Sequence, residues 1–160
     1  MLSENAPDPR RWKALALLCT AFFMVTLDAS IVIVALPSIG PDLGFAAGDL
    51  QWVMSAYGIT FAGLLLLGGR CADLLGRRRL FMVGTGLFAV SSFLCGLAWT
   101  DSALIAARAL QGVSAAIMAP TALSILSSTF REGPERNTAL GFWERAVGSA
   151  ARPAGWSAAP

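Results

Sequence analysis

Long stretches without charged residues alternate with short polar segments along this chain. Residues 50–69 and 80–100 contain no charged residue, and two further apolar stretches contain one each, Asp28 in the first and Arg108 in the second. A helix needs about 20 apolar residues to cross a hydrocarbon core of about 30 Å, and all four stretches reach that length. The pattern therefore predicts an all-α protein, a multi-pass transmembrane helix bundle with spans at about 14–36, 50–69, 80–100 and 103–127.

The two ends of the chain lack this pattern. Residues 1–13 precede the first span and are expected to form a cytoplasmic segment. Residues 131–160 carry Glu144, Arg145 and Arg152 after an apolar start. Because a charge at mid-bilayer costs about 2.5–3.5 kcal/mol, we expect this part to be cytoplasmic or an incomplete fifth span with an irregular tail. The first apolar stretch exceeds the core of a signal peptide, about 7–15 residues, so we expect it to stay in the mature chain.

Composition narrows the class of protein further. Charged residues make up 14% of the chain, against about 25% of an average soluble protein. The net charge of +2 is small, and no basic run is interleaved with aromatic residues, so we expect no nucleic-acid partner. The chain has no histidine, which excludes histidine-based metal sites and Ser-His or Cys-His catalytic pairs. We expect a protein of the lipid bilayer that is not an enzyme and that uses no cofactor.

Basic residues outside the spans predict the orientation in the membrane. Three precede the first span and four lie between the second and third spans, whereas none lies in either of the other two loops. Arg131 and Arg136 follow the fourth span. Cytoplasmic segments of membrane proteins carry an excess of lysine and arginine. The alternation therefore predicts that both ends of the four-span unit, including the N-terminus, face the cytoplasm.

Three motifs occur in order along the predicted spans. The first lies late in the first span (LDASIVIVALP, 27–37), the second follows the second span (GRCADLLGRRR, 69–79), and the third lies early in the fourth span (RALQG, 108–112). Together with QWV at 51–53 and Tyr57, these motifs make the chain resemble the start of a major facilitator superfamily transporter. It most resembles the fourteen-helix drug:proton antiporters of this superfamily.

The chain departs from the family pattern most clearly near its end. These antiporters have a glycine-rich pattern in their fifth helix, but Gly148, Arg152, Pro153, Trp156 and Ser157 occupy that spacing here. The resemblance implies twelve or fourteen helices in two halves. We therefore expect the 160 residues to be an N-terminal fragment that is inactive alone and whose partner is the missing remainder of the transporter.

Asp28 and Arg108 form the core of a candidate site inside the membrane. Asp28 lies about 21 Å from the cytoplasmic end of its span, and Arg108 lies about 7–8 Å from the outer end of its own, which gives the two residues similar depths. The resemblance places both at proton-coupling positions, and the alternative is a structural ion pair that fixes helix packing. Gln111 lies on the same helix face as Arg108, where it either faces the transport cavity or bonds to a neighbouring helix.

The segment after the second span is a second candidate site. Gly69 and Gly76 are expected to allow a tight turn between two spans, and Asp73 can pair with Arg77 or with a helix N-terminus. The resemblance implies that this gating loop, which includes Arg78, latches the two halves of a transporter in one access state. The alternative is that the arginines only set the orientation.

These observations predict a transmembrane transporter. The resemblance implies efflux of small lipophilic substrates across the bacterial inner membrane in exchange for protons, with the proton gradient as the energy source. One alternative is a membrane fragment that does not transport and instead interacts with other proteins. The other is an importer of a different small solute, because the same fold supports many cargoes.

Overall fold

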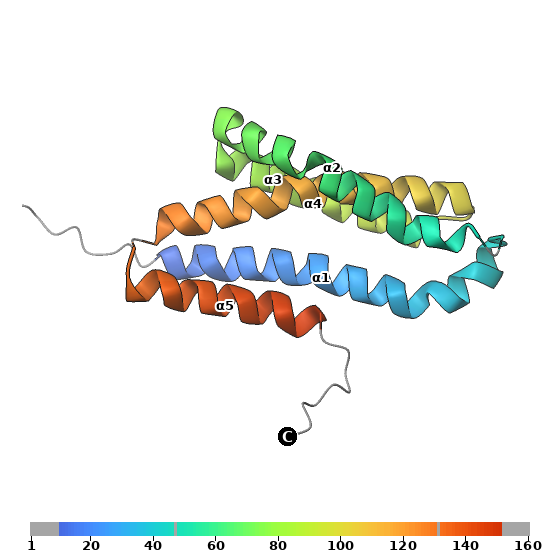
Figure 1. Cartoon of the computed structure of the whole chain (residues 1–160), viewed down its shortest axis with the longest axis horizontal. Coiled ribbons are helices and arrows are strands. Elements are labelled where there is room, and N and C mark those ends of the chain that lie inside the picture. Colours follow the sequence, from blue (N-terminus) through green and yellow to red (C-terminus); the bar gives the residue numbers. More distant parts are fainter. Residues whose placement is uncertain (1–9, 47, 131, 152–160) are drawn as a thin grey trace, which may run out of the picture.

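The computed structural model describes residues 10–46, 48–130 and 132–151. These residues form α1 (Arg10–Leu43), α2 (Leu50–Leu75), α3 (Arg77–Gly96), α4 (Asp101–Thr129) and α5 (Pro134–Ala151). Figure 1 shows the helices lying alongside one another, roughly parallel to the long axis of the molecule. The described residues contain no strand, and the predicted all-α class is confirmed.

The first four helices are long and apolar enough to cross a membrane. The shortest of them, α3, has 20 residues, which at about 1.5 Å per residue matches a hydrocarbon core of about 30 Å. The protein is therefore a multi-pass membrane protein, as the four apolar stretches predicted.

Two helices continue well beyond the ends of the predicted spans. α1 runs through Pro37 and Pro41 to Leu43, because a proline removes one helical hydrogen bond without forcing a membrane helix to stop. α2 runs on to Leu75, so the expectation that Gly69 forms part of a turn is wrong. The residues after Gly69 are mostly good helix formers, and the turn falls on Gly76 alone, whose φ of 92° is accessible to glycine.

The third and fourth helices are joined by a short connection. α3 begins at Arg77, three residues before the predicted span, and ends at Gly96. α4 begins at Asp101, where the Thr100 hydroxyl accepts a hydrogen bond from the backbone N–H of Ala103 at 3.2 Å. Such a bond satisfies one of the free N–H groups at a helix start and so stabilises the beginning of α4 at Asp101.

The segment after α4 is more regular than expected. Residues 134–151 form helix α5, which corrects the expectation of an irregular tail for this part, while residues 152–160 lie outside the described residues. An apolar face makes the helix possible: Ala139 is buried, and the Trp143 ring lies 4.7 Å from the Phe22 ring of α1. Glu144 and Arg145 are exposed away from this contact. Packing against α1 therefore stabilises the helix, while the charges, which argued against a complete fifth span and not against a helix, lie away from the packed face.

α4 is the central helix of the bundle, and α2 and α3 both pack along it. Gly112 of α4 lies so close to α2 that an added Cβ would clash with the Thr60 hydroxyl and the Tyr57 carbonyl. Gly68 of α2 likewise lies against the Ala116 carbonyl of α4. Small residues at such crossings let membrane helices approach closely, so these two glycines set the distance between α2 and α4.

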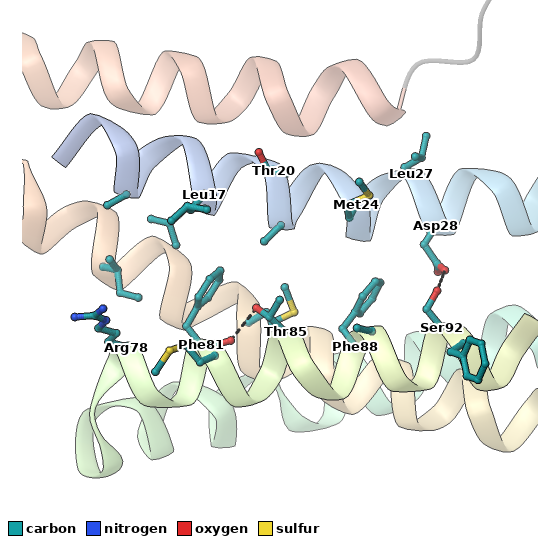
Figure 2. Close-up of a pocket in the computed structure, with 18 of the residues that line it drawn as sticks. Leu17, Thr20, Met24, Leu27, Asp28, Arg78, Phe81, Thr85, Phe88 and Ser92 are labelled. Carbon is teal, nitrogen blue, oxygen red and sulfur yellow. Dashed lines mark hydrogen bonds between the residues drawn. The ribbon is translucent and has the colours of Figure 1, made fainter. Parts of the chain in front are cut away.

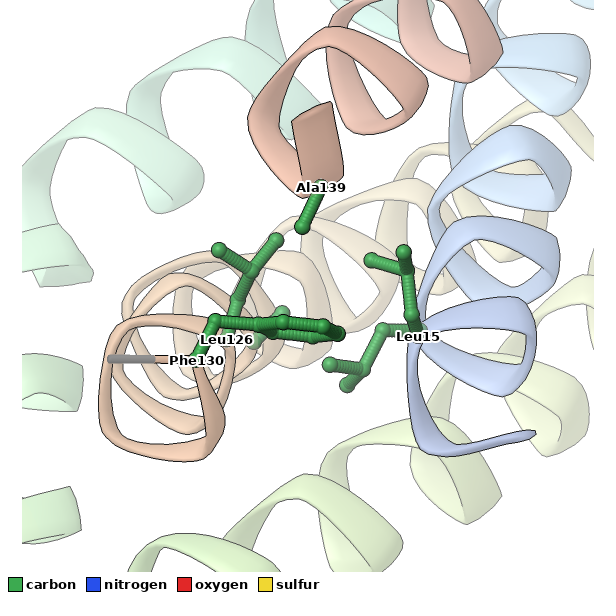
Figure 3. Packing of buried hydrophobic residues seen from close by; sticks show 6 residues of the cluster. Leu15, Leu126, Phe130 and Ala139 are labelled. Atoms are coloured by element: carbon green, nitrogen blue, oxygen red, sulfur yellow. The ribbon is translucent and has the colours of Figure 1, made fainter. Parts of the chain in front are cut away.

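α1 and α5 pair with each other on another side of α4. Their first turns are joined by an ion pair between Arg11 and Glu135, with a distance of 2.7 Å between Nη2 and Oε1. A buried apolar cluster joins α1, α4 and α5 near the same end, as Figure 3 shows; it consists of Leu15, Leu18, Ala122, Leu126, Phe130 and Ala139. The bundle is thus closed by apolar packing at the end where α1 begins.

Candidate functional site

α1 and α4 bring the two charged residues of the predicted membrane interior into direct contact. Arg108 Nη1 donates to Asp28 Oδ2 at 2.6 Å. The Arg108 side chain is fully buried, whereas 16% of the Asp28 side chain is exposed. The ion pair suggested by their similar depths is therefore present in the structure.

Gln111 closes a triangle with the two charged residues. Its Nε2 donates to Asp28 Oδ1 at 2.8 Å, and its Oε1 accepts from Arg108 Nη1 at 2.6 Å. The spacing of three residues along α4 makes this possible, because residues three apart lie on one helix face. Gln111 therefore bonds both to its own helix and to α1.

α2 holds Arg108 from a second side. Arg108 Nε donates to the Val53 carbonyl at 3.4 Å, and the Cζ atom lies 4.6 Å from the centre of the Tyr57 ring. Nη2 has no hydrogen-bond partner among the described residues. A cation over an aromatic face is stabilised by about 0.5–2 kcal/mol, so Tyr57 and Val53 fix the guanidinium independently of Asp28.

α3 adds two residues that the sequence did not single out. Ser92 Oγ donates to Asp28 Oδ1 at 3.4 Å, and Cys95 Sγ donates to Gln111 Oε1 at 3.7 Å. The two residues are three apart and so share a face of α3. That spacing was visible in the sequence, but the face of α3 that meets α1 and α4 was not.

Asp28 is also reached by a large groove between α1 and α3. The groove has a volume of about 1640 Å³, and Met118 and Ile125 of α4 also line it. Figure 2 shows Asp28 and Ser92 facing each other across one part of it and Arg78 at the opposite end. Most of the lining is apolar and includes Phe81, Phe88 and Met24. Asp28 is the carboxylate at this groove, and its partly exposed side chain can be reached from there.

The predicted gating loop lies apart from Asp28, around the turn between α2 and α3. Asp73 and Arg77 form an ion pair of 3.5 Å within one helical turn, and both side chains are largely exposed. Such exposed pairs contribute about 0–1 kcal/mol. Gly76 forms the turn, whereas Gly69 lies in α2 and Arg78 lines the groove. The structure thus places the two candidate sites in different parts of the bundle.

The polar cluster compensates for placing charge in an apolar setting. A buried ion pair loses the solvation of both ions and is tolerated where further hydrogen bonds satisfy the remaining groups. Here Asp28 accepts three hydrogen bonds, from Arg108, Gln111 and Ser92. Chemically, the arrangement offers a carboxylate that can accept a proton next to a guanidinium that keeps its charge.

Comparison with known proteins identifies the family of the chain. Residues 18–155 match the Major Facilitator Superfamily. The chain belongs to this superfamily. This major facilitator protein is 53% identical over 127 residues to the cephamycin export protein CmcT of Amycolatopsis lactamdurans, a match that covers 79% of this chain and 26% of CmcT.

Two further relatives extend the comparison. The chain is 48% identical over 147 residues to the puromycin resistance protein pur8 of Streptomyces alboniger, covering 92% of this chain and 29% of the relative. It is 47% identical over 116 residues to EfpA of Mycobacterium tuberculosis, an uncharacterized MFS-type transporter, covering 72% of this chain and 22% of the relative. The chain thus spans less than a third of the length of these curated relatives.

Proposed function

We propose that these residues form the N-terminal part of a proton-driven exporter of drugs or antibiotics in the bacterial inner membrane. The names of two relatives support export and resistance, since one is a cephamycin export protein and another a puromycin resistance protein. The observation that carries proton coupling is the Asp28–Arg108–Gln111 cluster at the groove. The substrate is a small lipophilic compound, and the proton gradient supplies the energy without a bound cofactor.

Asp28 is the group that takes up the proton in this proposal. It is the one carboxylate within the four predicted spans, and a proton added to Oδ2 replaces the hydrogen bond from Arg108. Arg108 keeps its contacts with Val53, Tyr57 and Gln111. Protonation therefore breaks the ion pair between α1 and α4 while the guanidinium stays in place. Ionic pairing within transmembrane bundles commonly marks such proton pathways.

The gating loop has a separate role in this proposal. Asp73 and Arg77 pair weakly at the surface, so the pair can exchange for contacts with the second half of a complete transporter. Transporters of this fold alternate access as one half rocks against the other. The contacts around Gly76 would then form in one access state and break in the other. They would lie on the side of the membrane that the arginines predict to be cytoplasmic.

A structural role for the ion pair is the second candidate. The complete burial of Arg108 and its several partners favour it, because such a side chain also fixes helix packing. In that case Asp28 and Arg108 stabilise the bundle and take no part in proton movement.

A chimera tests the proposal against this alternative. The 147 residues of this chain that match the puromycin resistance protein replace the corresponding segment of that protein, and puromycin resistance is measured in a sensitive host. Asp28→Asn keeps the size and planar shape of the side chain but can neither carry the charge nor take up a proton. We expect it to abolish resistance even when expression is raised until the membrane level of the variant matches that of the unmodified chimera. Asp49→Asn at a loop position serves as the control and keeps resistance. Full resistance with Asp28→Asn would leave Asp28 with a structural role only.

A further inference from the structure

The three hydrogen-bond partners of Asp28 differ in what they offer to a carboxyl group. Arg108 Nη1 donates to Oδ2 at 2.6 Å, whereas Gln111 Nε2 and Ser92 Oγ donate to Oδ1 at 2.8 and 3.4 Å. All three bonds suit the ionised form, because a carboxylate only accepts. A protonated carboxyl also has an O–H donor, so proton uptake creates a need for an acceptor that the ionised form does not have.

Neither partner on α4 is suited to accept from a protonated Asp28. A guanidinium has five N–H donors and no acceptor, which excludes Arg108. The side-chain oxygen of Gln111 has two lone pairs, and it already accepts from Arg108 Nη1 at 2.6 Å and from Cys95 Sγ at 3.7 Å. Turning the Gln111 amide round would place its NH₂ group against the guanidinium, so that two donors would face each other. Tyr57 of α2 also faces the cluster, but its ring lies against Arg108.

The enclosed guanidinium gives a second reason why the Gln111 oxygen does not change partners. Arg108 is fully buried, and its Nη2 has no hydrogen-bond partner among the described residues. Once Asp28 is protonated, Gln111 Oε1 is the acceptor that Nη1 keeps. Losing it as well would leave both terminal nitrogens of a buried cation unsatisfied, at the full desolvation penalty of these groups. We therefore expect Gln111 to stay bonded to Arg108 in both states.

Ser92 differs from the two partners on α4, because a hydroxyl can both donate and accept. Its Oγ donates to Asp28 Oδ1 in the ionised state, and the same hydroxyl can accept when the carboxyl carries a proton. Figure 2 shows the two side chains facing each other from α3 and α1. The contact lies between described residues of these two helices, so it does not depend on what covers the groove.

We propose that Ser92 accepts a hydrogen bond from the protonated carboxyl of Asp28 and so holds α1 against α3 in the proton-loaded state. This role rests on the proposed function, in which Asp28 takes up the proton. The proton adds to Oδ2, the carboxyl loses its negative charge, and the hydrogen bond from Arg108 is given up. A half-turn about the last side-chain torsion, which is broad and roughly two-fold in aspartate, then brings the O–H to Ser92. Proton uptake thus exchanges an ionic contact of α1 with α4 for a neutral contact with α3, and Ser92 is a positioning residue for this exchange.

Infrared difference spectra of the purified chain in lipid films test the proposal. Spectra recorded in heavy water at acid minus alkaline pH should contain a C=O band and an O–D band of the Asp28 carboxyl, both identified by their loss in Asp28→Asn. Ser92→Ala should move the O–D band to higher wavenumber, because an O–D bond that loses its acceptor becomes stiffer. Ser92→Thr keeps a hydroxyl and should keep the band in place. The control, Ser91→Ala, removes a hydroxyl that bonds to the Phe88 carbonyl of its own helix and should not move the band.

The two bands distinguish the role of Ser92 from the function on which it rests. Absence of an Asp28-dependent C=O band would show that Asp28 takes up no proton and would overturn both. A C=O band accompanied by an O–D band that Ser92→Ala does not move would overturn the role of Ser92 alone, because another group then accepts the hydrogen bond. Equal shifts with Ser92→Ala and Ser92→Thr would also overturn it, since packing and not the hydroxyl would then determine the band.

Puromycin efflux by the chimera provides a second test in a complete transporter. With membrane levels matched, Ser92→Ala should slow efflux about fivefold or more, because the buried O–H of a protonated Asp28 then lacks its acceptor. Ser92→Thr and Ser91→Ala should match the unmodified chimera. Unchanged efflux with Ser92→Ala would overturn the role of Ser92, whereas unchanged efflux with Asp28→Asn would overturn the proposed function itself.

Discussion

Arg108 and Asp28 form one ion pair but are held in very different ways. Arg108 is fully buried and has three partners besides Asp28: the Val53 carbonyl, the Gln111 side chain and the Tyr57 ring. Asp28 is partly exposed to the groove, and two of its three hydrogen bonds come from α4. At the scale of single residues, the guanidinium is the fixed part of the site and the carboxylate is the part whose state can change.

Breaking the pair from one side should cost more than removing both charges. Asp28→Asn leaves a buried guanidinium without its carboxylate, and Arg108→Gln leaves a carboxylate without its cation, at about 3–5 kcal/mol each. The double variant strands no charge and should be more stable than either single variant. The free energy of unfolding of the purified chain in mixed micelles measures this. Single costs that simply add in the double variant would mean that the two side chains do not interact.

The sequence indicated part of this site and could not indicate the rest. Asp28 and Arg108 stood out because charges are rare in apolar stretches, and their depths follow from helix geometry. Ser92, Cys95 and Val53 have no such signal, since small hydroxyls, thiols and backbone carbonyls occur throughout membrane helices. Their roles depend on which face of α2 or α3 meets α4, and one helix's sequence does not specify its neighbour.

At the scale of helices, the close crossing of α2 and α4 determines where the site residues stand. Thr60 Oγ1 donates to the Ala109 carbonyl of α4 at 3.0 Å, at the same crossing as Gly112. This crossing lies one turn from Arg108 along α4 and includes Tyr57 of α2. A wider separation of α2 and α4 would therefore move the Tyr57 ring and the Val53 carbonyl away from the guanidinium.

Gly112→Ala should force this crossing apart. The new methyl group meets the Tyr57 carbonyl, which is backbone and cannot rotate away, and overpacking of this kind costs about 1–3 kcal/mol. Gly58→Ala is the matched control, because its Cβ would meet nothing within 4 Å and alanine favours a helix by about 0.5–1 kcal/mol over glycine. Thermal unfolding in detergent should show a loss for the first variant only. Equal midpoints for both would show that the crossing is loose.

The ends of helices were harder to predict than their presence. Apolar stretches of about 20 residues or more located α1 to α4, because crossing a hydrocarbon core requires that length. The continuation of α2 through Gly69 to Leu75 and the formation of α5 depend instead on packing and on local helix preference. For α5, Ala139 and Trp143 contact neighbouring helices and stabilise it. Such contacts cannot be read from the hydropathy of individual residues.

At the scale of the whole molecule, the bundle has a distinct open side. α2, α3 and α4 pack closely, and α1 and α5 pair beside them, while the groove separates α1 from α3. Basic residues cluster where α1, α3 and α5 begin, whereas residues 44–49 and 97–100, which connect α1 to α2 and α3 to α4, carry none.

Cysteine labelling in sealed cells should report the orientation. In a background without Cys19, Cys71 and Cys95, a cysteine in place of Asp42 or Ser102 should react with an impermeant thiol reagent added outside. A cysteine in place of Arg79 should react only after the cells are opened. The physical reason is that basic segments remain on the cytoplasmic side, and labelling of the Arg79 position in sealed cells would reverse the orientation.

The 160 residues by themselves are expected not to transport. In transporters of this fold the substrate site lies at the interface between repeats and access alternates between two halves, whereas this chain spans less than a third of its curated relatives. Under an imposed pH gradient, liposomes that contain the purified chain should show no more movement of a fluorescent dye across the membrane than protein-free liposomes. Gradient-dependent dye movement that disappears with Asp28→Asn would contradict this expectation.

The single-residue connection at Gly76 also affects how the chain enters the membrane. α2 ends at Leu75 and α3 begins at Arg77. The end of α2 and the start of α3 must therefore lie on the same side of the bilayer. Arg77, Arg78 and Arg79 directly follow this tight turn, and Arg70 lies on α2 six residues before it. Moving such a cluster across the hydrocarbon is strongly unfavourable. The two helices are therefore favoured to insert together as one helical hairpin, with its charged tip held back on the side of synthesis.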